Sequence, residues 1–153
     1  MRATAGVLGL RVPLLIKALA AAQRRLAGDL LGAGCPGELR FRVELVVEEA
    51  VMNVIRHGRP AGACAVTMRL RAGAGRACLT LRDDGPAFDP LAAPVLALGG
   101  ARDGVEGGFG LHLIRRNADA AAYARRGRHN VLRLRFLPRG GGRAGVDGGR
   151  DRD

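Results

Sequence analysis

The spacing of apolar residues changes from a helical repeat to a strand repeat near residue 62, and this change constrains the fold strongly. Residues 13–32 and 37–57 repeat apolar side chains at the spacing of an amphipathic helix. From residue 62 the repeat becomes two residues, which is typical of a strand with one buried face. A helical segment and a half-buried strand each need a partner for their apolar side, so helices and sheet should cover one another.

The two predicted helices have recognisable ends. The first, over about residues 13–32, follows an irregular beginning and stops at the glycine-containing "GAG". The second, over about residues 37–57, has Pro36 beside its start and Gly58 directly after its last periodic residue. Proline favours the first turn of a helix and glycine its end, so both boundaries agree with the periodicity.

Two pairs of strands and a third helix complete the predicted order. The inward positions of the strands are Cys64, Val66, Met68 and Leu70, then Ala77, Leu79 and Leu81, and finally Leu132, Leu134 and Phe136. A third helix is predicted over about residues 109–118, and the last two strands turn near Gly127. The predicted fold class is α+β: a two-layer sandwich with the helices on one face of a mixed, mainly antiparallel sheet.

Two segments lack this periodicity. Residues 84–105 are rich in Gly, Pro, Ala and Asp, and we interpret this long loop as a lid, because such loops in compact domains are usually functional or disordered. Residues 138–153 are rich in glycine and charge with almost no apolar side chains. The sequence therefore predicts one domain over residues 1–137 and a disordered tail over 138–153.

The formal net charge of +11 raises the question of nucleic acid as a partner. The 25 basic residues, all arginine except Lys17, are scattered along the chain among many alanines and glycines. One Tyr, no Trp and four Phe also leave few side chains on which bases could stack. We therefore expect no direct nucleic-acid partner, with a small nucleic-acid-binding protein as the last-ranked alternative.

The remaining composition points to the cytoplasm. Arg11, Pro13 and Lys17 interrupt the N-terminal apolar stretch, so no run approaches the roughly 18 residues that a membrane span needs. That stretch also lacks the core and cleavage site of a signal peptide. The three cysteines are too far apart for a metal-binding or redox pair. We expect a cytoplasmic protein without a membrane partner.

The first candidate cluster lies on the second predicted helix. Glu49 and Asn53 are one turn apart on a shoulder of its apolar face, His57 follows one turn later, and Glu48 falls on the opposite side. A carboxylate and an amide at the border of core and solvent suit proton transfer and Mg²⁺ coordination. The alternative is an ordinary solvated glutamate and a surface asparagine.

The second candidate is the strand end in "LRDDGPAFDP". Asp83 shares the inward face of Leu81 by strand alternation, which places a carboxylate at the inner edge of the sheet. A buried carboxylate needs a hydrogen-bond donor such as an adenine amino group, and Gly85 would let a ring approach the backbone. A plain turn with solvated aspartates is the alternative.

The third candidate is the glycine-rich start of the third helix in "EGGFGLHLI". Gly107, Gly108 and Gly110 can direct backbone N–H groups inward, and the helix starting near Phe109 adds the positive end of its dipole. Such a site suits phosphates. A flexible turn before a helix is the alternative, since the stretch lacks the Lys-Ser/Thr of a P-loop.

The order of these motifs resembles the GHKL ATP-binding superfamily, which has the Bergerat fold, and most closely its anti-sigma-factor serine/threonine kinase branch. "VELVVEEAVMNVIRHG" resembles the N box of that branch, "LRDDGPAFDP" its first glycine box and "EGGFGLHLIRRNADAAAY" its second. The resemblance runs over about residues 13–137. One departure is Ala87, which replaces the last glycine of the first glycine box.

The resemblance implies ATP and Mg²⁺ as cofactors. Asn53 would bind Mg²⁺, and Glu49 would be the catalytic base toward a seryl hydroxyl. Asp83 would accept a hydrogen bond from the adenine amino group above Gly85.

At the other end of the nucleotide, Gly108, Gly110 and Leu111 would contact the phosphates through their backbone, with Gly107 as the hinge of the lid. The lid contains no Ser or Thr, which speaks against its closing over the phosphates.

The implied function is an ATP-dependent protein-serine/threonine kinase that phosphorylates an anti-sigma-factor antagonist of the STAS type and sequesters a sigma factor. A homodimer is typical of that branch. The alternative is a nucleotide-gated binding switch of the same fold without kinase activity.

Overall fold

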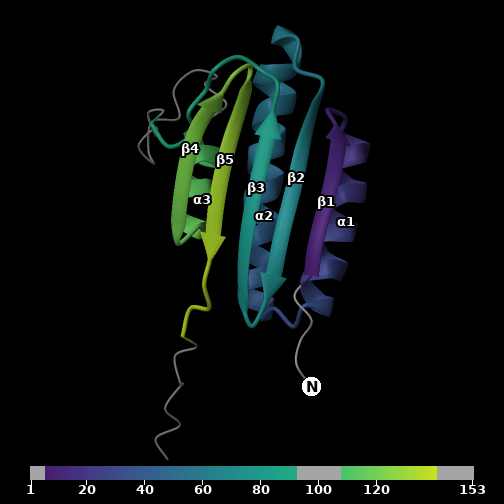
Figure 1. Cartoon of the computed structure of the whole chain (residues 1–153), viewed down its shortest axis with the longest axis vertical. Helices are drawn as coiled ribbons and strands as arrows, with labels where there is room; N and C mark the ends of the chain where they lie inside the picture. The colour runs from purple at the N-terminus through teal and green to yellow at the C-terminus, as the bar shows by residue number, and fades with distance from the viewer. Residues whose placement is uncertain (1–5, 93–107, 141–153) are drawn as a thin grey trace, which may run out of the picture.

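The computed structural model describes residues 6–92 and 108–140, in which three α-helices lie behind one five-stranded sheet (Figure 1). The strands are β1 (Gly6–Pro13), β2 (Ala65–Gly73), β3 (Arg76–Asp83), β4 (Ala120–Arg126) and β5 (His129–Phe136), and the α-helices are α1 (Ile16–Gly32), α2 (Gly37–Asn53) and α3 (Gly108–Asn117). The strand order is β1-β2-β3-β5-β4, and each of the four pairings is antiparallel. The predicted two-layer α+β sandwich is confirmed, with a wholly antiparallel sheet where a mixed one was expected.

The N-terminal strand is the main correction to the prediction. Residues expected to be irregular form β1, the edge strand that pairs with β2 from Gly6 opposite Ala72 to Pro13 opposite Ala65. The first helix therefore begins at Ile16 rather than near residue 13. Proline is tolerated at the end of an edge strand, because the missing N–H faces no partner there.

The second helix ends differently from an ideal α-helix. α2 stops at Asn53, and the chain continues through a π-helical turn over Val54–Gly58 and a short 3₁₀ turn over Arg59–Ala61. The predicted helix over 37–57 thus corresponds to α2 plus the π-helical turn. π-helical turns are frequent at functional sites because they redirect side chains that an α-helix would keep in line.

The β2–β3 hairpin fixes the register of the central strands. Its loop is the pair Ala74–Gly75, with φ of +50° and +73°. Positive φ at both positions matches the twist of the strands in a two-residue hairpin. Cys64 was predicted to share the inward face of β2, but it lies before that strand and is exposed. This part of the prediction is wrong.

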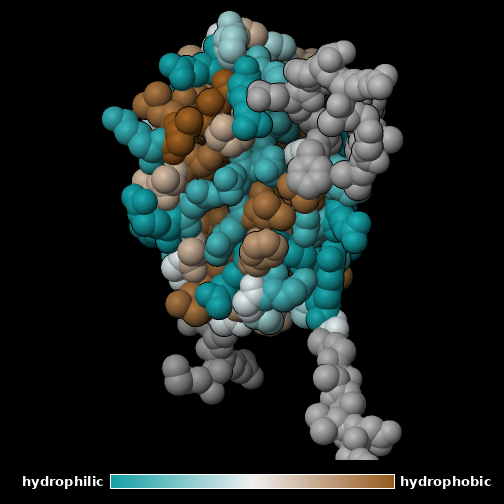
Figure 2. All heavy atoms as spheres, turned by 180° about the vertical axis from the view of Figure 1, so that it is seen from behind, coloured by the Kyte–Doolittle hydropathy of each residue, from teal (hydrophilic) through white to brown (hydrophobic). Residues whose placement is uncertain are grey.

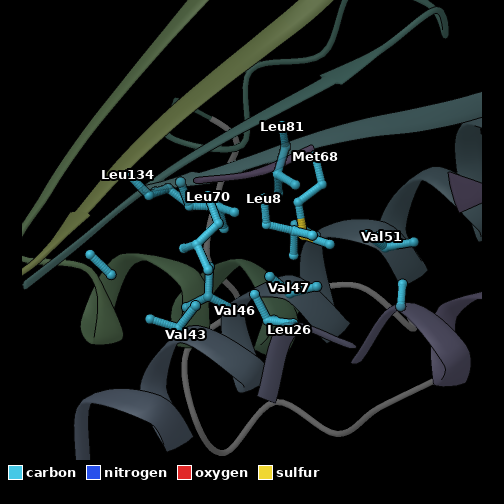
Figure 3. Packing of buried hydrophobic residues seen from close by; sticks show 14 of the residues in the cluster. Leu8, Leu26, Val43, Val46, Val47, Val51, Met68, Leu70, Leu81 and Leu134 are labelled. Carbon is cyan, nitrogen blue, oxygen red and sulfur yellow. The ribbon is translucent and has the colours of Figure 1, made fainter. Parts of the chain in front are cut away.

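The core lies between α2 and the inner face of the sheet (Figure 3). The side chains that meet there are Val43, Val46, Val47 and Val51 of α2, Leu26 of α1, and Leu8, Met68, Leu70, Leu81 and Leu134 of the sheet. Valine is a weaker helix former than leucine or alanine, so burial rather than propensity stabilises α2. Full burial of one such side chain contributes about 1.5–3 kcal/mol.

A buried arginine ties α2 to the last helix and strand. The Arg42 side chain is only 3% exposed, and its Nε lies 2.6 Å from a Glu38 carboxylate oxygen. Its Nη1 donates to Asp119 Oδ2 at 2.9 Å and to the Asn117 carbonyl at 3.0 Å, and its Nη2 donates to the Leu137 carbonyl. A buried guanidinium needs such partners to offset the loss of its hydration.

The pKa of Asp119 reflects this network. Burial alone would raise the pKa of its carboxyl, but the backbone N–H of Leu137 and the charge and hydrogen bond of Arg42 outweigh it. The net effect is a lowered pKa. Asp119 is therefore ionised at neutral pH and remains an ion-pair partner for Arg42.

The helical side carries apolar patches between polar side chains (Figure 2). Large apolar side chains exposed on the first two helices include Ile16, Leu31 and Phe41. Within the residues that the structure describes, none of the helices combines the length and apolarity needed to cross a membrane. Residues 93–107 and 141–153, which include most of the predicted lid and tail, lie outside the described residues.

Replacing Arg42 by methionine should destabilise the protein strongly. The substitution keeps much of the side-chain volume but leaves the Asn117 and Leu137 carbonyls and the Asp119 carboxylate without their buried donor. We expect the free energy of unfolding in urea to fall by about 3 kcal/mol. Arg24→Met, at an exposed position of α1, is the matched control and should change it by less than about 0.5 kcal/mol. Equal effects of the two substitutions would contradict the assigned role of Arg42.

Candidate functional site

A cavity of about 220 Å³ opens between the end of α2 and the sheet. Its walls come from α2 and the turn after it, from strands β2 to β5, from the segment after β3 and from α3. Three of the predicted site residues, Asn53, Asp83 and Gly85, line this cavity together with His57. Side chains that are 30 residues apart in the sequence thus meet at one site.

The carboxylate of Asp83 is held by two hydrogen bonds. Asp83 is the last residue of β3, and its inward direction follows from that of Leu81, as predicted. Its Oδ1 accepts from the backbone N–H of Gly85 at 2.9 Å and from Nδ2 of Asn130 at 2.9 Å. In residues 6–92 and 108–140, no donor is assigned to the other oxygen, Oδ2, so one oxygen of a fixed carboxylate is available to a ligand.

Gly85 is a glycine because of its neighbours. A Cβ at this position would lie 2.9 Å from Asp83 Oδ1, and 3.5 Å from both Ala63 Cβ and Gly58 Cα. Any side chain would therefore displace the Asp83 carboxylate. The sequence predicts that a glycine here lets a ring approach the backbone, and the structure adds that the absence of a side chain lets the Asp83 carboxylate accept the Gly85 N–H.

The two adjacent glutamates of α2 point to different neighbours. Glu48 is exposed, and its Oε2 accepts a hydrogen bond from Gln23 of α1 at 3.4 Å. Glu49 is partly buried, and its carboxylate lies against Gly110, where an added Cβ would overlap Oε2. The structure thus separates the two carboxylates as the helical spacing predicted, with Glu49 on the side of Asn53 and α3.

The glycine-rich start of α3 is described only in part. α3 begins at Gly108. The next two predicted residues, Gly110 and Leu111, are both buried, and neither of them lines the cavity. Gly107, the predicted lid hinge, lies outside the described residues. Contact of Gly108, Gly110 and Leu111 with phosphates remains a prediction, while the close approach of Glu49 already gives Gly110 a packing reason to be glycine.

The sequence analysis missed Asn130, which is buried and lines the cavity. Its Nδ2 donates to Asp83 Oδ1 at 2.9 Å and to the Pro86 carbonyl at 2.8 Å. Asn130 thus links β5 to the end of β3 and to the segment that follows it. The signal in the sequence was a polar residue on the inward side of a strand, two residues before Leu132.

The Asn130 side-chain oxygen is equally engaged. It accepts from the Tyr123 hydroxyl at 2.7 Å, from Arg125 Nη1 at 3.0 Å and from the backbone N–H of Phe88 at 3.2 Å. Arg125 Nη1 also donates to the Gly85 carbonyl at 2.8 Å. Because both the nitrogen and the oxygen of the Asn130 amide have hydrogen-bond partners, the amide has one fixed orientation. Its Nδ2 therefore also holds the Asp83 carboxylate in one position.

Asp84, the residue directly after β3, holds the end of this strand from the side opposite to the cavity. Its Oδ1 accepts a hydrogen bond from the backbone N–H of Cys64 at 2.9 Å. This bond is the main reason why the pKa of Asp84 is lowered. The adjacent aspartates thus have separate roles, because Asp84 ties the end of β3 to the chain before β2 while Asp83 faces the cavity.

Comparison with known proteins defines the class to which this site belongs. Residues 12–136 match the family model of the histidine kinase-like ATPase domain. The match covers most of the chain, so the chain belongs to this family, as its motifs indicated. A domain of this family implies ATP binding, and the cavity beside the end of α2 is the candidate site for the nucleotide.

Two relatives narrow the class. The chain is 35% identical to the serine/threonine-protein kinase BtrW of Bordetella bronchiseptica over 98 residues, which are 63% of this chain and 69% of that protein. Its fold is similar to the crystal structure of the RsbU and RsbW domains of Rv1364c from Mycobacterium tuberculosis, with a TM-score of 0.58 and 17% identity. That match covers 86% of this chain but only 32% of the other, so it shows the fold alone. The family model and the similarity to BtrW agree with the resemblance of the motifs to the anti-sigma-factor kinase branch.

Removing the Asn130 amide should weaken nucleotide binding through Asp83. In Asn130→Ala, Asp83 Oδ1 loses one of its two donors and several buried polar groups lose a partner. We expect ATP affinity, measured by calorimetry, to fall by about tenfold and the free energy of unfolding by about 1–3 kcal/mol.

The matched control is Tyr123→Phe, which removes a hydrogen bond to the opposite end of the amide and leaves the bond to Asp83 in place. Its ATP affinity should change less than threefold. If both variants bind ATP as the wild type does, Asn130 does not position Asp83.

Proposed function

We propose that this protein binds ATP with Mg²⁺ and transfers a phosphoryl group to a serine or threonine of an anti-sigma-factor antagonist. The observation that carries the proposal is the meeting of Asn53, Asp83 and Gly85 in one cavity of a histidine kinase-like ATPase domain. Similarity to BtrW, a serine/threonine-protein kinase, supports a hydroxyl as the acceptor.

The base of the nucleotide would bind beside Asp83. Its Oδ1 is already engaged by Gly85 and Asn130, which leaves Oδ2 to accept the adenine amino group. Apolar side chains such as Leu81 and Leu132 form much of the surrounding wall, which suits a flat ring with a single polar edge to be recognised. Specificity for adenine would come from this one carboxylate and its fixed direction.

The residues present fit Mg²⁺ bound through a nucleotide rather than a metal site made by the protein alone. The part of the chain that the structure describes contains no group of three His, Cys, Asp or Glu side chains that could hold a metal. Asn53 offers one amide oxygen in the cavity, and Mg²⁺ characteristically combines one or two such ligands with phosphates and water. When bound, Mg²⁺ would neutralise charge on the phosphates during transfer.

Glu49 is the proposed catalytic base. It lies one helical turn before Asn53 and is partly buried against the N-terminal turn of α3. A base must come within about 2.6–3.2 Å of the hydroxyl whose proton it accepts. In the proposed reaction the acceptor hydroxyl approaches between α2 and α3, gives its proton to Glu49 and attacks the γ-phosphorus in line. The bond from that phosphorus to the β,γ-bridging oxygen breaks, and ADP is the leaving group.

The proposed partners are an antagonist of the STAS type, as the phosphoacceptor, and a sigma factor that the protein sequesters. The three ordered motifs that resemble the anti-sigma-factor kinase branch, together with the similarity to BtrW, support partners of this kind. We further propose that the protein acts as a homodimer in the cytoplasm. Phosphorylation of the antagonist would then control how much sigma factor stays bound.

One observation favours a second candidate, a nucleotide-gated switch without kinase activity. Glu49 does not line the cavity, and its carboxylate lies against Gly110. In this arrangement the carboxylate packs between two helices and would sense the position of α3 rather than receive a proton. Nucleotide binding could then alter the partner-binding surface through α3 alone.

The Mg²⁺ dependence of ATP binding tests the assignment of Asn53. Wild-type protein should bind ATP about tenfold more tightly with Mg²⁺ than with EDTA, and Asn53→Ala should lose this gain while keeping the affinity measured in EDTA. Asp83→Asn should bind weakly in both conditions, because the adenine contact is lost. Equal ATP affinity of wild type and Asn53→Ala with and without Mg²⁺ would remove the metal assignment.

Transfer of ³²P from ATP to antagonist proteins encoded in the same genome tests the kinase. Glu49→Gln should lose at least about 100-fold in transfer rate and keep its ATP affinity, because only the proton acceptor changes. Glu48→Gln, the neighbouring carboxylate directed toward α1, is the matched control and should transfer at the wild-type rate. ATP binding without transfer by the wild type, with partner regulation unchanged in Glu49→Gln, would favour the switch.

A further inference from the structure

The face of the sheet turned away from the helices is covered by arginines. Figure 1 views the molecule onto this side of the sheet, with the helices behind it. We call it the arginine face and define it by six exposed residues on four strands: Arg11, Arg69, Arg71, Arg82, Arg133 and Arg135. Each alternates with buried residues along its strand, as a side chain on the outer face must.

The pairing register spaces these arginines regularly. Three rows across the sheet each place a small residue between two arginines: Arg69, Thr80 and Arg133; Arg71, Cys78 and Arg135; Arg11, Thr67 and Arg82. Two strand spacings separate the arginines of a row by roughly 10 Å, and two residues along a strand separate them by roughly 7 Å. Like charges are never directly opposite one another, which limits the cost of gathering them.

None of these six arginines forms an ion pair within residues 6–92 and 108–140. The ion pairs of that part of the chain use Arg25, Arg42 and Arg139, none of which belongs to the arginine face. Arg82 contacts His129 Nδ1 at 2.9 Å, which adds no negative charge. The six guanidinium groups therefore present a concentrated positive field to any approaching molecule.

The residue types on the arginine face and the twist of the sheet favour some anionic partners over others. The Tyr and Phe of the described strands, Tyr123 and Phe136, lie on the inner side of the sheet, so unstacked bases of single strands would find no platform on the arginine face. The residues between the arginines are small, so the buried apolar anchors typical of a protein interface are missing. Normal twist turns a five-stranded sheet by roughly 80–100° from edge to edge, which fits a curved rod better than a flat bilayer.

We propose that the arginine face binds the phosphate backbone of duplex nucleic acid without sequence specificity. Guanidinium groups pair with phosphate oxygens through two parallel hydrogen bonds and gain affinity by releasing counterions. The expectation that nucleic acid is not a partner rested on arginines scattered along the chain and on few side chains for base stacking. The sheet gathers six of the arginines onto one surface, so the first reason no longer applies, and the second concerns single strands rather than a duplex.

The nucleotide cavity and the arginine face lie on opposite sides of the sheet. Asp83 and Leu132 reach the cavity from the inner face, while Arg82 and Arg133, their neighbours in sequence, are exposed on the outer face. Both ligands could therefore be bound at once. This proposal is independent of the proposed kinase activity, and it would keep a regulator of transcription close to its template.

Fluorescence anisotropy with a labelled DNA duplex of about 30 base pairs, titrated over a series of NaCl concentrations, tests the proposal. The test variant replaces Arg69, Arg71, Arg133 and Arg135 by glutamine. The control variant carries the same change of charge on the helical side, where Lys17, Arg24, Arg56 and Arg116 are exposed. Urea unfolding of all three proteins checks that each is folded.

We expect wild type and control to bind the duplex and the test variant to lose at least tenfold in affinity at about 100 mM NaCl. The slope of log K against log [NaCl] should become shallower by about 3.6 in the test variant, because four phosphate contacts are lost. Asp83→Asn, which impairs the proposed ATP site, should bind the duplex as the wild type does. Failure of the kinase proposal would thus leave this result unchanged.

Several outcomes would overturn the proposal. One is equal weakening of the test and control variants, which would mean that net charge alone attracts DNA. Another is the absence of wild-type binding at about 50 mM NaCl. Equal or tighter binding of poly-L-glutamate or of phosphatidylserine vesicles, lost in the test variant, would assign the face to an acidic protein or to a membrane instead.

Discussion

The packing of α2 on the inner face of the sheet is the contact on which the rest of the structure depends. Val43, Val46, Val47 and Val51 are buried there, and the same helix carries Glu49 and Asn53 beyond the edge of this apolar stripe. Because the valines set the rotation and height of the helix, they also set where its polar residues lie. A helix rotated by one residue, about 100°, would direct Asn53 away from the cavity.

A second set of contacts fixes the sheet side of the site. Asn130 connects β5 and β4 to the end of β3, and Arg125 adds a bond to the Gly85 carbonyl. Arg42 performs the comparable task at the opposite end of the helical layer, where it joins α2 to residues near α3 and β5. Rigid supports of this kind keep a carboxylate such as Asp83 in one orientation before any ligand arrives.

Charge is distributed so that the sheet separates two surfaces. The carboxylates of the candidate site lie on α2 and at the end of β3, whereas the outer side of the strands carries arginines. The alternation of a strand produces this separation directly, because neighbours such as Arg82 and Asp83 must point to opposite faces. One sheet can therefore hold a nucleotide on one side and present a cationic surface on the other.

Periodicity along the chain predicts most of the helices and strands and the placement of several candidate site residues, but not the contacts between distant strands. Helical spacing already put Glu49 and Asn53 on one side of α2 and Glu48 on the other, and strand alternation directed Asp83 inward, because these relations depend only on periodicity. β1 escaped prediction because its inward alternation, Leu8, Leu10 and Val12, is short and lies among glycines, which strands disfavour, so that it is recognisable as a strand only through its pairing with β2.

The hydrogen bonds of Asn130 and the gathering of the arginine face could not be read from the sequence for a related reason. Both join residues from strands that are distant along the chain, such as Asp83 with Asn130 and Arg69 with Arg133. Periodicity tells which face of its own strand a residue occupies. Only the order and register of the strands decide which residues share that face as neighbours.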